Sequence, residues 1–210
     1  MVKSQIADEV LVACKLLNGH LYKGKEIGRE QMHCDTKLIE GLVKIFKNHI
    51  DMLLETIMNL VDGNGNNALH YAVSFRNWKV VDLLLATGLM NLNLPNKAGY
   101  TPVMMAALAG VAGEEDKEIA SKLFQAGDVN KQVEDTGQSS LMLAVSRGRI
   151  DMVEICLNIG ADINAQDEDG STALMCACEH GHINIAKRLL QHPECDASIL
   201  DNVSLSLSVQ

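Results

Sequence analysis

Four similar segments recur about every 33 residues along the chain, and this repeat constrains the fold more than any other feature of the sequence. Each segment runs from a glycine, through short polar residues, to an alanine, and the four glycines lie 34, 38 and 33 residues apart. A period of this length is typical of proteins in which each repeat buries its apolar face only against its neighbours. The segments span residues 65–72, 99–106, 137–144 and 170–177.

Each repeat predicts a polar turn followed by a first helix. The glycine ends the turn, because glycine readily adopts the positive φ that other residues resist. Two residues later, a short polar side chain can accept a hydrogen bond from an amide of the first helical turn and so cap the helix. The expected capping residues are Asn67, Thr101, Ser139 and Thr172.

A second helix is expected in each repeat from an apolar run farther along the chain. Three of these helices run up to a glycine, which we expect just after the helix in a left-handed conformation; these residues are Gly88, Gly127 and Gly160. Each repeat is therefore expected to be a pair of helices joined by a short connection. The apolar runs occupy residues 80–85, 119–124, 152–157 and 185–190.

The second and the last repeats depart from the pattern. The interval from Ala106 to Gly127 spans 21 residues, against 16 in the first and third repeats, and the surplus lies around residues 113–117. We expect an insertion between the two helices there, because loops accept extra length at small cost. A fifth repeat begins over residues 196–201 and then breaks off, since Ser204 stands where the turn glycine is expected. This break predicts a truncation, an alternative C-terminus or an artefact of the gene model.

The repeats are preceded by further helical patterns. Apolar residues recur at helical spacing within residues 6–21 and 38–60. We expect residues 4–61 to form an N-terminal helical cap, because stacked repeats need such a cap over their open end. Residues 62–202 are then about four complete repeats and a broken fifth, and residues 203–210 are a divergent tail.

The period and the T-P-L-H-x-A-like strings of the four segments resemble the ankyrin repeat, a β-turn followed by two antiparallel helices. The resemblance implies an all-α fold, an ankyrin repeat solenoid. Composition agrees, since 47 % of the residues are hydrophobic and only 3 % are aromatic, which favours an aliphatic core on small-residue helices.

Longer strings are more specific than the ankyrin consensus and resemble the C-terminal ankyrin domain of the KANK family, the KN motif and ankyrin repeat domain proteins. The resemblance implies a cytoskeletal adaptor near the cell cortex and focal adhesions that restrains actin polymerisation. It also implies a protein partner, a peptide motif from a kinesin-4 motor. The family's KN motif and coiled coil are not found in this sequence, so we expect the chain to be a fragment. The strings are residues 62–71, 96–102, 140–153 and 167–182, within a resemblance that covers about residues 7–202.

Charge and hydropathy exclude several classes of partner. The net charge is −9, and a chain with surplus anionic residues does not attract nucleic acid or anionic membranes. The longest run without charged or strongly polar residues, 102–113, is about half the length of a bilayer span, so no membrane insertion is expected. Six cysteines without an N-terminal targeting pattern favour reduced thiols and a cytoplasmic location. We expect a monomer.

The expected binding surface is the concave face, formed by the turn tips and the exposed side of the first helices. Apolar side chains at three of its positions are either anchors for a peptide or packing contacts with a neighbouring repeat. The residues placed on this face by the repeat register are Asn64, Asn66, Ser74, Phe75, Lys97, Tyr100, Leu108, Thr136, Gln138, Ser146, Arg147, Glu168, Asp169, Ser171, Glu179 and His180.

Residues 176–182 contain two cysteines and two histidines in seven positions, which suggests a metal site or a catalytic thiol. Metal binding is disfavoured, because Cys176 and Cys178 on one helix point about 200° apart around its axis. A thiol enzyme would pair Cys178 with His180 or His182 as its base. We expect no catalytic residue, no metal and no cofactor. The alternatives to a binding module are a fragment without autonomous binding activity and a thiol- or metal-dependent enzyme.

Overall fold

The structure is a computed structural model, and it describes residues 51–202. Within these residues it is built of helices without a strand, which confirms the all-α fold class. Of the expected N-terminal cap, residues 4–50 lie outside the described range, as does the tail over residues 203–210. The helices are α3 (Asp51–Met58), α4 (Ala68–Ser74), α5 (Trp78–Ala86), α6 (Pro102–Ala109), α7 (Glu114–Ala126), α8 (Ser140–Ser146), α9 (Ile150–Asn158), α10 (Ala173–Glu179) and α11 (Ile183–Leu190).

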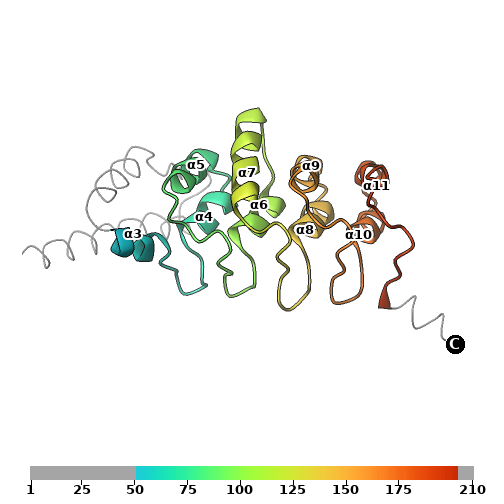
Figure 1. The fold of residues 1–210 in the computed structure, drawn as a ribbon, viewed down its shortest axis with the longest axis horizontal. Coiled ribbons are helices and arrows are strands. Elements are labelled where there is room, and N and C mark those ends of the chain that lie inside the picture. Colours follow the sequence, from blue (N-terminus) through green and yellow to red (C-terminus); the bar gives the residue numbers. More distant parts are fainter. Residues whose placement is uncertain (1–50, 203–210) are drawn as a thin grey trace, which may run out of the picture.

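The eight helices from α4 to α11 form four pairs that stack in a row, with all turns projecting to the same side (Figure 1). The first helices α4, α6, α8 and α10 contact one another in order and form one layer. The second helices α5, α7, α9 and α11 form the other layer, and the buried aliphatic core lies within and between the layers. Each repeat therefore buries its apolar side chains mainly against adjacent repeats.

The expected caps and turns are confirmed. Each capping side chain accepts a hydrogen bond from the amide three residues later, at 3.1 Å in the first repeat and 3.3 or 3.4 Å in the others. The turn glycines have φ between 68° and 79°, a conformation that favours glycine. The caps are Asn67, Thr101, Ser139 and Thr172, and the glycines are Gly65, Gly99, Gly137 and Gly170.

Polar bonds join each repeat to the next. In the layer of second helices, an ion pair connects each neighbouring pair of helices: Lys122 with Asp82 at 2.9 Å, Lys117 with Asp151 at 3.8 Å, and Arg188 with Glu154 at 2.7 Å. In the loops after α3, α5, α7 and α9, an asparagine side chain accepts a hydrogen bond from a backbone amide of the following loop, 32 or 35 residues farther along the chain. These asparagines are Asn59, Asn93, Asn130 and Asn164.

The surplus residues of the second repeat lengthen α7 more than the loop before it. The helix has 13 residues, against 9 in α5 and α9, and it stands above its neighbours in Figure 1. The connection before it, residues 110–113, is only one residue longer than its equivalents. The expectation that the surplus residues form a loop is therefore wrong, because most of them form an added helical turn. Three acidic residues lie in the first turn of α7, where their negative charges interact favourably with the positive N-terminal end of the helix.

Gly127 ends α7 as expected but for a different reason from Gly88 and Gly160. Those two residues have φ of 67° and 89°, whereas Gly127 is extended, with φ of −97° and ψ of 174°. A Cβ atom at Gly127 would lie 2.5 Å from Cγ2 of Val103, so the glycine permits a close approach of the chain to α6. The expectation of a left-handed conformation at Gly127 is wrong.

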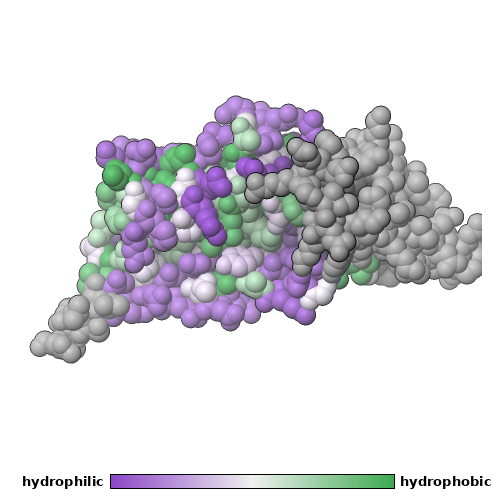
Figure 2. Space-filling view, turned by 180° about the vertical axis from the view of Figure 1, so that it is seen from behind, coloured by the Kyte–Doolittle hydropathy of each residue, from purple (hydrophilic) through white to green (hydrophobic). Residues whose placement is uncertain are grey.

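The stack continues into the start of the fifth repeat. The amide of Asn202 donates to the carbonyl of Asp169, and the Gln166 side chain donates to the carbonyl of Leu200. On α11, Leu190 is 55 % exposed, whereas its equivalent on α9, Leu157, is 7 % exposed. Figure 2 shows hydrophobic surface gathered at this end of the row and a mostly hydrophilic edge along the turns.

His70 connects the first two repeats from inside the core. It is fully buried, its Nδ1 accepts from the amide of Asn67 at 3.2 Å, and its Nε2 donates to the carbonyl of Tyr100 at 3.1 Å. Burial lowers its pKa below the usual 6.5, although the bond to Tyr100 works in the opposite direction. The side chain of His70 therefore joins the first turn to the backbone of the second repeat.

Replacing Gly127 by alanine should lower the free energy of unfolding by about 1–3 kcal/mol, because the methyl group would collide with Val103. Urea denaturation followed by circular dichroism measures the change. Gly63→Ala is the matched control, since a Cβ atom at Gly63 meets nothing within 4 Å. Equal midpoints for the two variants would contradict the close-approach argument.

Methionine stands at the positions equivalent to His70 in the other repeats, 104, 142 and 175. Replacing His70 by methionine should lower the free energy of unfolding by about 1 kcal/mol at pH 7.5, because the hydrogen bond to Tyr100 is lost. The lowered pKa of His70 means that its stabilisation is present above about pH 6.5 and is lost as the pH falls toward its folded value. The stability difference between wild type and His70→Met should therefore narrow on acidification. A difference in unfolding free energy that stays constant from pH 7.5 to pH 5 would contradict this.

Candidate functional site

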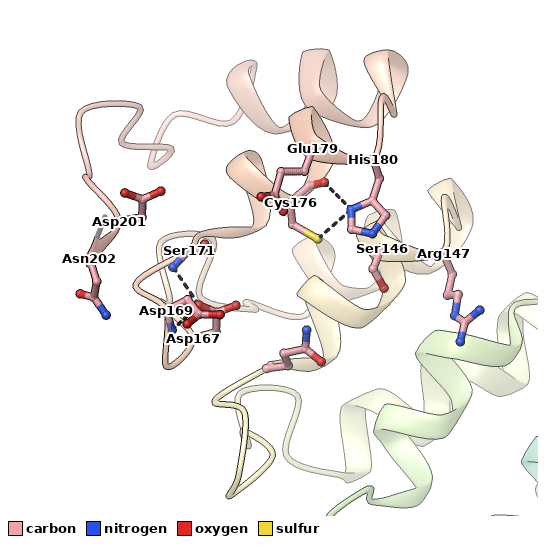
Figure 3. Close-up of a pocket in the computed structure, with 11 residues that line it drawn as sticks. Ser146, Arg147, Asp167, Asp169, Ser171, Cys176, Glu179, His180, Asp201 and Asn202 are labelled. Carbon is pink, nitrogen blue, oxygen red and sulfur yellow. Dashed lines mark hydrogen bonds between the residues drawn. The ribbon is translucent and has the colours of Figure 1, made fainter. Parts of the chain in front are cut away.

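A groove lies between the turns and the first helices of the third and fourth repeats. Its volume is about 800 Å³. One wall is formed by turn residues, including two from the start of the fifth repeat, and the other by the last turns of α8 and α10 (Figure 3). The lining residues are Gln138, Ser146, Arg147, Asp167, Asp169, Ser171, Cys176, Glu179, His180, Asp201 and Asn202.

None of the sixteen residues expected on the concave face is buried. Seven of them line the groove: Gln138, Ser146, Arg147, Asp169, Ser171, Glu179 and His180. The other nine lie outside it, on the first two repeats or at turn tips: Asn64, Asn66, Ser74, Phe75, Lys97, Tyr100, Leu108, Thr136 and Glu168. That these residues bind a partner stays a prediction.

Several of the expected contact residues also hold the stack together. The Asn66 side chain accepts from Asn96 of the next turn at 2.9 Å. The backbone of Lys97 donates to Asn64, and that of Glu168 donates to Thr136, which joins neighbouring turn tips. These residues therefore expose side-chain surface while their backbones or amide groups fix the spacing of the turns.

The sequence analysis missed four residues that line the groove: Asp167, Cys176, Asp201 and Asn202. Asp167 opens a turn, and its Oδ1 accepts from the amides of Asp169 and Ser171. Asp201 repeats Asp167 at an offset of 34 residues, a signal that the repeat itself carried. Placing Asp201 at the groove requires the fifth turn to stack on the fourth, as the bond from Asn202 to Asp169 shows.

Negative charge dominates this part of the groove. Four carboxylates line it, Asp167, Asp169, Glu179 and Asp201, against a single guanidinium on Arg147. Figure 3 shows Arg147 at the side of the groove opposite Asp201, so the cation does not lie among the carboxylates of the turns. Among the described residues, no ion pair involves Arg147, Asp169 or Glu179.

His180 contacts Cys176 rather than the Cys178 that was considered as a nucleophile. Its Nδ1 lies 3.0 Å from the carbonyl of Cys176 and 3.7 Å from its Sγ. Burial, with help from the carboxylates of Glu179 and Asp167, raises the pKa of the Cys176 thiol to about 11. A reactive cysteine needs the opposite shift, because the thiolate is the nucleophile. Within residues 51–202, no group of three or more His, Cys, Asp or Glu side chains is arranged to hold a metal ion.

The first two repeats present apolar side chains on the corresponding surface. Phe75 is 50 % exposed, and its ring stacks on that of Tyr71 with centroids 6.2 Å apart. Tyr100 and Leu108 are half-buried and pack against the core. The sequence left two roles open for these apolar residues, packing within the stack or anchoring a peptide. Tyr100 and Leu108 have packing contacts, whereas Phe75 has half of its surface available to a partner.

Comparison with known proteins agrees with this architecture. The family model for ankyrin repeats in three copies matches residues 38–133 and 111–201. The chain belongs to the ankyrin repeat family. Ankyrin repeats are typically non-catalytic interaction domains. In this chain the turn tips and the first helices form the concave face that contains the groove. Within the described repeats, no helix is long and apolar enough to cross a membrane.

The ankyrin repeats are similar to part of a larger protein from Danio rerio whose name describes a palmitoyltransferase, ZDHHC13. The two sequences are 33 % identical over 135 residues, which is 62 % of this chain and 20 % of the relative. The chain thus spans about a fifth of the length of that protein.

The raised pKa of Cys176 predicts slow alkylation. At pH 7.5 iodoacetamide should modify Cys178, which is exposed, well before Cys176, and the rate at Cys176 should rise about tenfold per pH unit. Peptide mass spectrometry measures both rates. Glu179→Gln should accelerate the reaction of Cys176, because it removes a carboxylate that raises this pKa. If Cys176 reacts faster than free cysteine at pH 7.5, the assigned environment is wrong and a catalytic thiol has to be reconsidered.

Proposed function

We propose that this chain is a non-catalytic binding module that holds a peptide segment of a protein partner along its concave face. The observation that carries the proposal is the groove itself, which is open and is lined by side chains from both turns and helices of the third and fourth repeats. On the corresponding surface of the first repeat, Phe75 is half exposed. Peptides that lie in a groove bury more of their surface than peptides on a flat face, which suits this shape.

The partner that we propose is a kinesin-4-type peptide motif, and the setting is a cytoskeletal adaptor of the cytoplasm and cell cortex that acts in negative regulation of actin polymerisation. The support for this finer assignment is the resemblance of residues 62–71, 140–153 and 167–182 to the KANK ankyrin domain. The proposed unit is a monomer with an N-terminal helical cap over residues 4–61, followed by the repeats.

Overlapping synthetic peptides that tile a kinesin-4 sequence test the assignment by fluorescence anisotropy with the full chain. One of these peptides should bind, and Tyr100→Ala or Leu108→Ala should weaken it by about tenfold, which corresponds to about 1.4 kcal/mol. Both side chains retain exposed surface on the proposed face.

The control is Leu85→Ala, because Leu85 is also half-buried against the core but lies on α5, in the other layer. It should reduce stability to a similar extent and leave binding unchanged. Equal losses of affinity in all three variants would assign the effect to folding. Unchanged affinity in Tyr100→Ala and Leu108→Ala would remove the concave surface of the second repeat from the proposal, and a lack of binding by every peptide would remove the kinesin-4 motif.

A further inference from the structure

Equivalent positions on the first helices change character from one end of the stack to the other. The three outward positions in the last turn of each helix are Tyr71, Ser74 and Phe75 in the first repeat and Met105, Leu108 and Ala109 in the second. The third repeat has Ser146 and Arg147 at the last two of these positions, while Leu143 at the first of them is buried. The fourth repeat has Cys176, Glu179 and His180. The surface is therefore apolar over α4 and α6 and polar over α8 and α10.

The turns follow the same gradient. The residue just before the turn glycine is Asp169 in the fourth repeat, where the first three repeats have Asn64, Ala98 and Thr136, and Asp169 lines the groove. Because Asp169 and Glu179 have no ion-pair partner among the described residues, their charges are available to a ligand.

We propose that the concave face, of which the groove is one part, selects a peptide with two features: an apolar side chain that packs on Phe75 and Leu108, and a lysine or arginine that lies between Asp169 and Glu179 in the groove. This inference rests on the proposed function and adds the chemistry of the partner to it. Four carboxylates against one arginine favour a cation in the groove, and the net charge of −9 favours the approach of a basic segment.

The spacing of the helices sets the spacing of the two features. Packed helices lie roughly 8–10 Å apart, so the two steps from α6 to α10 separate Leu108 from Glu179 by roughly 16–20 Å. An extended peptide covers that distance in about five or six residues, and a helical peptide in about eleven to thirteen. A motif with the cation directly beside the apolar residue does not fit both sites.

Selection from a random peptide library on phage, about 16 residues long, against the full chain tests the proposal without prior choice of a partner. Enriched peptides should combine an apolar residue with a lysine or arginine at one of these separations. Synthetic copies should bind the double variant Asp169→Lys, Glu179→Lys at least about tenfold more weakly than wild type, and raised salt should weaken binding to wild type.

The matched control is Glu115→Lys, Glu118→Lys, which makes the same change in net charge at exposed positions on α7. It should leave affinity close to that of wild type. Phe75→Ser should remove the apolar preference with little effect on folding, since this side chain is half exposed.

The outcomes separate the two proposals. If no peptide is enriched, or if enriched peptides ignore Phe75→Ser and the groove variant alike, the groove is not a binding site and the proposed function fails. If peptides depend on Phe75 but carry no cation, or bind the lysine variant as well as wild type, only the further inference fails. Enrichment of acidic peptides that depend on Arg147 would likewise overturn it.

Discussion

Burial between neighbours is the interaction on which this structure depends. A pair of helices of seven to nine residues is too small to bury its own apolar surface, so each layer is completed by the next repeat. Leu157 and Leu190 show the effect at equivalent positions: Leu157, on α9 within the stack, is 7 % exposed, and Leu190, on the last described helix α11, is 55 % exposed. The stability of the array is therefore distributed over its contacts rather than concentrated in one core.

The same stacking fixes the binding surface. The hydrogen bonds from the asparagine side chains and those between neighbouring turns recur from one repeat to the next. Side chains at equivalent positions therefore form rows along the concave side. The bonds between neighbouring turns, such as those from Lys97 to Asn64 and from Glu168 to Thr136, join backbone atoms. The side chains at these positions can therefore differ without loss of the bonds. A rigid scaffold with variable rows explains how one architecture can serve partners of different chemistry.

Sequence patterns predicted the local features of the fold well. The caps at Asn67, Thr101, Ser139 and Thr172 and the turn glycines follow from spacing and side-chain chemistry alone. Gly127 and the length of α7 were misread, because one depends on a distance to Val103 and the other on whether an acidic segment folds as loop or helix. At the groove, the repeat register found seven lining residues but not Cys176 or Asp201, whose placement requires adjacent repeats to be packed.

The N-terminal part of α7 packs little against the neighbouring repeats. Its first buried residue is Ile119, so residues 114–118 have little apolar contact with either neighbour. Their helical state depends on local terms: acidic side chains at the N-terminus and the weak ion pairs of Lys117 with Glu114 and Asp151. This part of α7 is therefore a negatively charged protrusion whose helical state does not rely on the burial that stabilises the repeats, so the two are stabilised by different interactions.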